Sequence, residues 1–487
     1  MTSDLHHLTL AEAAALIRAR QLSPVELVTA KLDRINSLDR RLHSFITVTA
    51  ESAIADARKA ESELARGLSR GPLHGIPIAH KDVVWTRGVR TTAHSRLLRD
   101  WVPSQSATVF ERFRSAGAIS LGKTSLHEFA FGSPGLDEAF PAARNPWNLD
   151  HMPGSSSSGS AAAVAAGLVL GATGSDTGGS VRHPAAACGI VGMKPTHGRI
   201  SCYGVIPLAP SMDHVGVLTR TVQDNALMLQ AAAGFDPKDP MSVSVEVPDF
   251  SALIGEDISG IRIGIPRRFI ESTEHTPDIL TAFGEALDVF TDLGAVFTDV
   301  DPDGLADSYD AGSLIITYEG YRYHRAQLEQ NPGEFGDNFK SRFGGADEIT
   351  ESDYEASKAN MRRLRASVAQ IHRSGIDLLI NPGRERPAQT MTELLDDPLG
   401  KRSLALRMHS VTGNPALVQP MGITTDGLPL GLQIAAARWR EDLIYQVAAA
   451  YEAATGWGDR GPWDDSLASN PMVDANAASS RVGSATR

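Results

Sequence analysis

Short apolar runs alternate with helical stretches along most of this chain, beginning at Gly71. Residues 107–115 have a helical pattern that Gly117 ends, and the next segment, 118–122, has the composition of a strand. Alternation of this kind is typical of a layered α/β fold, in which helices cover the faces of a sheet. The two patterns return later, as strands at 261–265 and 377–382 and as helices at 275–293 and 351–374. We therefore expect an α/β fold.

The sequence divides into three parts. Residues 1–70 contain three helical segments, two of which begin with capping-box patterns at Thr9 and Ser23. We expect this helical region to pack on a core formed by the main domain, 71–465. Residues 466–487 are rich in Ser, Ala and Asn and have no periodicity, so they predict a disordered tail.

Charge and composition limit the classes of partner. The formal net charge is −12, and an acidic surface repels phosphate backbones, so we expect no direct nucleic-acid binding. The sequence has no run of about 18 apolar residues and no secretory signal pattern, so we expect no membrane association. The only two cysteines, Cys188 and Cys202, fit structural thiols in a reducing cytosol, and we expect a cytoplasmic protein.

A glycine-rich turn indicates where chemistry could take place. Residues 145–220 are dense in Gly, Ser and Pro but keep their apolar residues, which favours ordered loops around a site. Within them the strand-like run 168–173 leads into 174–182 (GSDTGGSVR), which contains Ser180. Backbone N–H groups of such a turn can hold an anion, and acyl transfer needs an anion site beside a nucleophile. A phosphate-binding loop or a plain strand–helix turn has the same pattern.

Two further segments carry hydroxyl and amine groups. Residues 153–160 (PGSSSSGS) precede an alanine-rich helix, and hydroxyls beside a buried helix need partners, which a proton-passing network provides. A flexible linker or a helix cap is the alternative. Lys81 follows the apolar run 76–79. A lysine at a strand end is usually exposed, but a buried one has a lowered pKa and can act as a base.

Together these segments resemble the amidase signature family over roughly Leu8 to Trp457. Five other motifs carry the resemblance: NPW at 145–147, GMKPT at 192–196, SMDHVG at 211–216, GNPA at 413–416 and GLP at 427–429. The resemblance implies the amidase signature fold, an α/β fold with a large central mixed β-sheet flanked by helices on both faces. It also implies that 71–465 is the catalytic domain, with a variable substrate-site insert at about 300–410.

The resemblance implies a Ser–cis-Ser–Lys triad. Ser180 is then the nucleophile, Ser156 the bridging proton relay, and Lys81 the base, and the Ser155–Ser156 peptide bond should be cis. We expect four backbone N–H groups to form the oxyanion hole, those of Thr177, Gly178, Gly179 and Ser180. We expect four side chains to support the site without reacting, those of Ser155, Ser157, Asp176 and Arg182. The chain departs from the family's serine loop at Ser155 and Ser158, which replace glycines.

The implied activity is hydrolysis of an acyl C–N bond in a small-molecule amide, such as an aryl amide or a carbamate, through a serine acyl-enzyme. We expect no cofactor, no metal, and a monomer or homodimer. One alternative is the glutaminase A subunit of an aminoacyl-tRNA amidotransferase, which residues 333–341 resemble weakly. Another is an inactive structural homologue, which the retained triad disfavours. The sequence does not identify the substrate.

Several other residues have open interpretations. Four aromatic side chains fit either an apolar pocket or the core: Phe129, Phe131, Phe140 and Trp147. His183 fits a substrate contact or a structural role. Residues 67–71 (GLSRG) match the G-x-S-x-G pattern of Ser–His–Asp hydrolases, but they follow a charged helix rather than the strand that a nucleophile elbow requires, so we reject that mechanism.

Overall fold

The computed structural model describes residues 5–135, 137–396 and 404–462, and the tail predicted at 466–487 lies outside them. Eleven strands form one sheet in the order β1-β3-β2-β4-β6-β5-β10-β11-β9-β7-β8. The strands are β1 (Phe45–Val48), β2 (Pro77–Lys81), β3 (Ile119–Thr124), β4 (Gly171–Ser175), β5 (Val191–Lys194), β6 (Val215–Thr219), β7 (Arg262–Ile265), β8 (Val296–Asp299), β9 (Leu378–Pro382), β10 (Ala416–Ile423) and β11 (Pro429–Ala436). Strand β2 is parallel to β3 and β4, whereas β4 is antiparallel to β6. The predicted large mixed sheet is confirmed.

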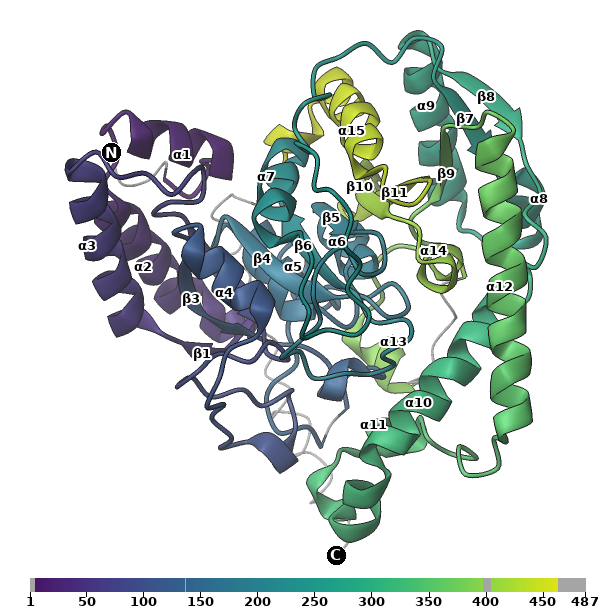
Figure 1. The fold of residues 1–487 in the computed structure, drawn as a ribbon, viewed down its shortest axis with the longest axis horizontal. Helices are drawn as coiled ribbons and strands as arrows, with labels where there is room; N and C mark the ends of the chain where they lie inside the picture. Colours follow the sequence, from purple (N-terminus) through teal and green to yellow (C-terminus); the bar gives the residue numbers. More distant parts are fainter. Residues whose placement is uncertain (1–4, 136, 397–403, 463–487) are drawn as a thin grey trace, which may run out of the picture.

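Helices surround this sheet (Figure 1). They are α1 (Leu10–Arg18), α2 (Pro24–Leu42), α3 (Ala50–Ala65), α4 (Thr108–Ser115), α5 (Ser158–Ala165), α6 (Arg182–Cys188), α7 (Val222–Ala232), α8 (Arg267–Ser272), α9 (Pro277–Asp292), α10 (Ser308–Gln330), α11 (Asp337–Ser341), α12 (Glu351–Arg373), α13 (Met391–Asp396), α14 (Arg407–Thr412) and α15 (Glu441–Thr455). One apolar cluster joins α2, α3, α5 and α6 to the sheet, and a second joins α7, α9 and α15 to it. In the described parts of the chain, every helix is too short or too polar to span a bilayer.

The N-terminal 70 residues are built into the core. Thr9 forms the predicted capping box of α1, and Ser23 caps α2 with Pro24 in its first turn. The carboxylate of Asp224, on α7, accepts hydrogen bonds from the first two backbone N–H groups of α1. Strand β1 pairs antiparallel with β3 at the edge of the sheet. The first 70 residues therefore supply an edge strand as well as helices.

Small residues allow the central helix α5 to lie deep in the molecule. All eight of its residues are buried. A Cβ atom added at Gly159 would lie 2.4 Å from the carbonyl oxygen of Ser44 and 2.5 Å from the amide nitrogen of Ser125. Only glycine fits at that distance. The start of α5, directly after the serine-rich loop, is consequently held against the residues that precede β1 and follow β3.

Two long helices form one side of the molecule. Helices α10 and α12 each have 23 residues, and they pack against one another and against the short α14 (Figure 1). The sequence pattern predicted α12 but not α10. The N-terminal ends of α10 and α14 bring Tyr309 and Arg407 to the cavity described below.

Candidate active site

Strand order brings the three predicted segments together. Strands β2 and β4 are parallel neighbours in register, with His80 opposite Thr173. Both strands therefore end at the same edge of the sheet, where open α/β folds place ligands. Lys81 is the last residue of β2 and Ser175 the last of β4, and the Lys81 amide donates a hydrogen bond to the Thr173 hydroxyl.

Lys81 lies at the centre of a buried hydroxyl network. Its side chain is completely buried, and its Nζ is 2.8 Å from the Oγ of Ser156 and 2.8 Å from the Oγ of Ser175. Burial lowers the pKa of Lys81 to about 7, although the negative charges of Asp176 and Asp213 act in the opposite direction and raise it. A substantial share of Lys81 is therefore neutral near pH 7 and able to accept a proton from Ser156.

The serine-rich loop is held from several sides. The Ser155–Ser156 peptide bond is cis, as the family resemblance implied. The Ser155 amide donates to Nδ1 of His183 at 2.9 Å, and the Ser157 amide donates to the carbonyl oxygen of Ser180 at 3.2 Å. The Ser157 hydroxyl also hydrogen-bonds the backbone of Ser175. These contacts join the loop to both β4 and the glycine-rich turn.

An ion pair inside the protein shapes that turn. Asp176 and Arg182 are both fully buried and lie 2.9 Å apart. The Asp176 carboxylate also accepts the N–H groups of Gly179 at 2.8 Å and Val181 at 3.2 Å. Burial works against ionisation of Asp176, but Arg182 keeps the pKa of that carboxyl below its usual value. The geometry fits the supporting roles expected for both side chains.

The hydrogen bond at Gly179 changes the expected oxyanion hole. Its amide already donates to Asp176, so this N–H is not freely available to a developing oxyanion. Within the described chain, the amides of Thr177, Gly178 and Ser180 donate to no protein acceptor. These three remain the candidates for holding an anion beside the Ser180 hydroxyl.

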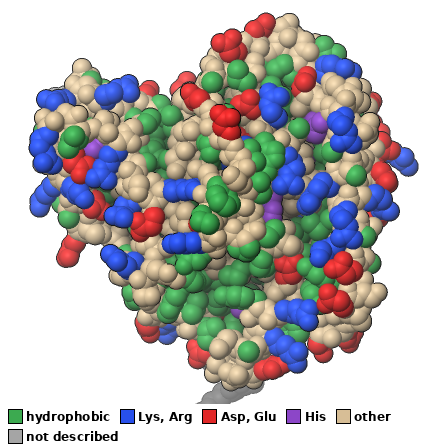
Figure 2. Space-filling view, viewed as in Figure 1, with side chains coloured by type: hydrophobic (Ala, Val, Ile, Leu, Met, Phe, Trp, Pro, Cys, Tyr) green, Lys and Arg blue, Asp and Glu red, His purple; other side chains and the backbone are tan. Residues whose placement is uncertain are grey.

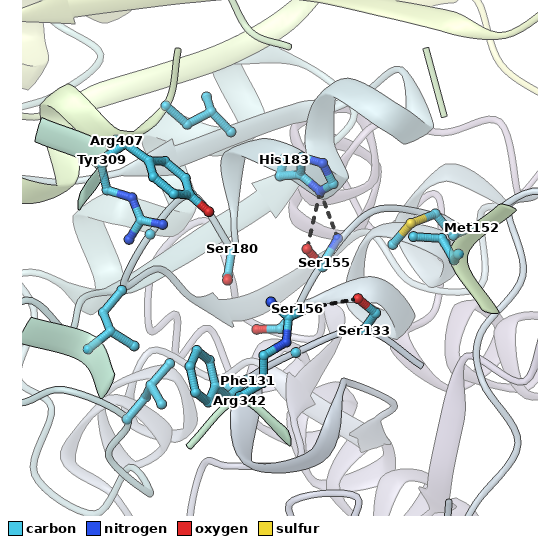
Figure 3. A pocket seen from close by; sticks show the side chains of 18 of the residues that line it. Phe131, Ser133, Met152, Ser155, Ser156, Ser180, His183, Tyr309, Arg342 and Arg407 are labelled. Atoms are coloured by element: carbon cyan, nitrogen blue, oxygen red, sulfur yellow. Dashed lines mark hydrogen bonds between the residues drawn. The ribbon is translucent and has the colours of Figure 1, made fainter. Parts of the chain in front are cut away.

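One cavity of about 170 Å³ contains the reactive groups. Ser156, Ser180 and His183 line it, and Figure 3 shows the Ser180 hydroxyl directed into it. Of the four aromatic residues considered from sequence, only Phe131 lines this cavity. The other three are engaged elsewhere: Phe129 with Phe335 and Phe339, Phe140 with His94, and Trp147 with the carbonyl of Cys188.

The site also contains side chains that sequence reasoning missed. Ser175, beside Lys81, lies in the glycine-rich segment 174–182 but was assigned no role. Three residues of the cavity wall lie in no motif and reach the cavity only through tertiary packing: Tyr309, Arg342 and Arg407. The Arg342 guanidinium donates to the Ser133 hydroxyl at 3.1 Å. In contrast, Ser69 of the G-x-S-x-G match is exposed in the loop after α3 and does not line the cavity.

Comparisons with known proteins cover the segments that form this site. The Amidase family model matches residues 26–445. The A subunit of the glutamyl-tRNA(Gln) amidotransferase of Geobacter metallireducens is 38% identical over 487 aligned positions, covering 93% of this chain and 98% of that protein. A solved structure of the corresponding A subunit from Thermotoga maritima has a TM-score of 0.77 and 30% identity, covering 92% of this chain and 95% of its own.

A second structure, from a vestigial protein complex that reveals the origins of an s-triazine catabolic enzyme, has a TM-score of 0.86 and 30% identity. It covers 92% of this chain and 99% of its own. The residues that the family model matches include the segments that contain Lys81, Ser156 and Ser180. This chain therefore belongs to the amidase signature family.

Proposed function

We propose that this chain hydrolyses the side-chain amide of glutamine through a Ser180 acyl-enzyme, as the A subunit of an aminoacyl-tRNA amidotransferase. The observation that carries the chemistry is the 2.8 Å contact between Lys81 Nζ and Ser156 Oγ, in a buried loop that lines the same cavity as Ser180. The choice of glutamine as substrate, and of an assembly with other subunits, is based on the names of the relatives.

The reaction follows from the contacts. Neutral Lys81 takes a proton from Ser156, Ser156 takes one from Ser180, and the Ser180 oxygen attacks the amide carbon. The three amides without protein acceptors, Thr177, Gly178 and Ser180, hold the oxyanion. The relay returns the proton to the leaving nitrogen, which departs as ammonia. Water, deprotonated by the same relay, then releases the carboxylic acid from Ser180.

The pocket supports glutamine over the aryl amide or carbamate that the sequence alone favoured. Two arginines, Arg342 and Arg407, line the cavity. Its described lining residues include one phenylalanine, Phe131, and one tyrosine, Tyr309, and no tryptophan. Arginine suits the carboxylate of an amino acid, and an aryl group gains most from an aromatic wall. Together with the relatives' names, this favours the alternative of a glutaminase subunit, and partner subunits rather than a monomer or homodimer.

The test is an acyl-transfer assay on the purified chain, alone and after co-expression with candidate partner subunits. Glutamine and an anilide panel are offered with hydroxylamine as trapping nucleophile. We expect glutamine to be preferred and Ser180→Ala to abolish turnover. Ser158→Ala is the matched control, because Ser158 is a buried serine of the same loop whose hydroxyl has no hydrogen-bond partner among the described residues, and it should remain active. Preference for anilides would contradict the glutaminase role, and an active Ser180→Ala would contradict the mechanism.

A further inference from the structure

Two partly buried arginines lie against one short stretch of backbone at the end of α14. Arg365 lies on α12, and Arg438 follows β11. Nη2 of Arg365 donates a hydrogen bond to the carbonyl of Val411 at 3.3 Å. Nη2 of Arg438 donates to the carbonyl of His197 at 3.3 Å. The amide of His197 in turn donates to the carbonyl of Gly413 at 3.0 Å, which joins the two contacts.

Most of the donors on these two side chains are unused. A guanidinium carries N–H groups on Nε, Nη1 and Nη2, and within the described residues each arginine donates to the protein only through Nη2. The Nε of Arg365 and the Nε of Arg438 are buried without an acceptor. Unpaired donors of a charged group are costly when water is excluded from them. Both guanidiniums therefore retain capacity for a further acceptor at Nη1.

The charge around this pair of arginines is not balanced. Burial, together with the nearby cationic side chains, lowers the pKa of His197 to about 4, so the ring is neutral at neutral pH. The negative charge of Glu441 acts on Arg438, but that carboxylate is already paired with Arg199 at 3.1 Å. Within the described parts of the chain, neither Arg365 nor Arg438 has a carboxylate at ion-pair distance. Two positive charges thus lie side by side without a counter-charge.

This basic cluster is separate from the reactive cavity. His197, Arg365 and Arg438 are not among the described residues that line the cavity of Ser180. Figure 2 shows lysine and arginine side chains gathered on the face of the molecule over α12 and α14. The chain as a whole has a formal net charge of −12, so an excess of positive charge at one place favours an anionic ligand there.

We infer that Arg365 and Arg438 bind a phosphate group beside His197. A phosphate dianion matches the two positive charges, and its oxygens accept charge-assisted hydrogen bonds from both guanidiniums at once. A carboxylate carries a single charge, and its oxygens match the fork of one guanidinium. The phosphate is either free or carried by a small molecule such as a nucleotide. This inference does not depend on the proposed function.

Calorimetric titration of the full chain with inorganic phosphate tests the site. Low ionic strength and about pH 8 keep phosphate dianionic and the charges unscreened. Wild type should bind phosphate saturably and acetate far more weakly. Arg365→Met and Arg438→Met should each weaken phosphate binding about tenfold or more, and the double variant should remove it. Arg373→Met removes an exposed arginine of the same helix and should bind phosphate as wild type does.

Two further measurements complete the test. AMP binding that is tighter than phosphate binding, and equally sensitive to Arg438→Met, identifies a nucleotide as the source; weaker AMP binding identifies free phosphate. Arg438→Lys keeps the charge and should retain part of the affinity. If circular dichroism shows that Arg365→Met does not fold, Arg438→Met carries the test, because within the described residues Arg438 makes a single hydrogen bond to the protein. Absence of saturable phosphate binding, equal binding of acetate, or phosphate binding unchanged in Arg438→Met overturns the inference.

Discussion

The amine of Lys81 and the hydroxyl of Ser156 lie 2.8 Å apart, although 75 residues separate them in sequence. The lysine has no exposed surface, and its second contact, Ser175, is at the same distance. A lysine in such surroundings works as a base only in its neutral form. The pH at which it loses its proton therefore sets the pH at which the relay begins to operate.

Activity should rise with pH through the neutral range. Burial lowers the pKa of Lys81 to about 7, so below pH 7 the protonated, inactive form dominates and above pH 7 the neutral form does. We expect kcat/KM to rise about tenfold per pH unit below 7 and to level off above it. Lys81→Ala should remove most activity together with this transition.

A second buried lysine provides the control for that experiment. Lys31, on α2, is 1% exposed, its pKa is also lowered by burial, and its amine donates to the carbonyl of Gly167. Lys31→Met should leave the midpoint of the pH profile in place. A Lys81→Ala enzyme that keeps a wild-type profile would remove Lys81 from the role of base.

Arg182→Met should destabilise the fold strongly. It leaves the buried Asp176 carboxylate without its partner and removes contacts to the Leu406 carbonyl and the Gln433 side chain. Breaking one side of a buried pair typically costs about 3–5 kcal/mol in the free energy of unfolding, measurable by urea denaturation. Arg268→Met, in the exposed pair with Asp301, should have little effect. Similar values for the two variants would contradict a supporting role for Arg182.

Local patterns were enough to predict the centre of the fold, whereas the roles of Lys81, Ser156 and Ser180 were implied only by the family resemblance. Strands β2, β3 and β9 and helices α3, α9 and α12 have clear periodicity or end signals, and the structure has them within a few residues. Strand β4 begins and ends later than the run 168–173 predicted. That difference places Ser175 inside the strand next to Lys81, which explains why it was not recognised as a second partner of the lysine.

Helix α10 and the walls of the cavity could not be predicted in the same way. The buried face of α10 includes Ser308, Gly312 and His324, so no regular apolar stripe marks it. Tyr309 and Arg407 are 98 residues apart and meet only because α10 packs against α14. Neither residue has neighbours in sequence that indicate a binding role. Contacts of this kind depend on the assembled fold.

His183 should act by positioning the serine loop. Its Nδ1 accepts the Ser155 amide at 2.9 Å, and Figure 3 shows the imidazole directed at Ser155. Burial keeps the pKa of His183 well below its usual value, so the ring is neutral at neutral pH. We expect His183→Ala to lower kcat about 10- to 100-fold and leave the pH midpoint unchanged. His183→Asn, which keeps an acceptor near Nδ1, should recover part of kcat. A shifted midpoint would instead make His183 a titrating group.

Two glycine-to-alanine substitutions distinguish a steric clash of the new methyl group from the general effect of replacing a glycine. At Gly178 a methyl group would meet the Arg407 guanidinium at 2.6 Å, and at Gly284, within α9, it would meet nothing within 4 Å. Gly178→Ala should therefore displace Arg407 and lower kcat/KM for a carboxylated amide at least tenfold, mainly through KM. Gly284→Ala should raise the free energy of unfolding by roughly 0.5–1 kcal/mol without changing the kinetics, because alanine restricts the unfolded chain and favours helix. Steady-state kinetics and thermal denaturation of both variants test this. Wild-type kinetics in Gly178→Ala would mean that the contact between Arg407 and the turn has no part in substrate binding.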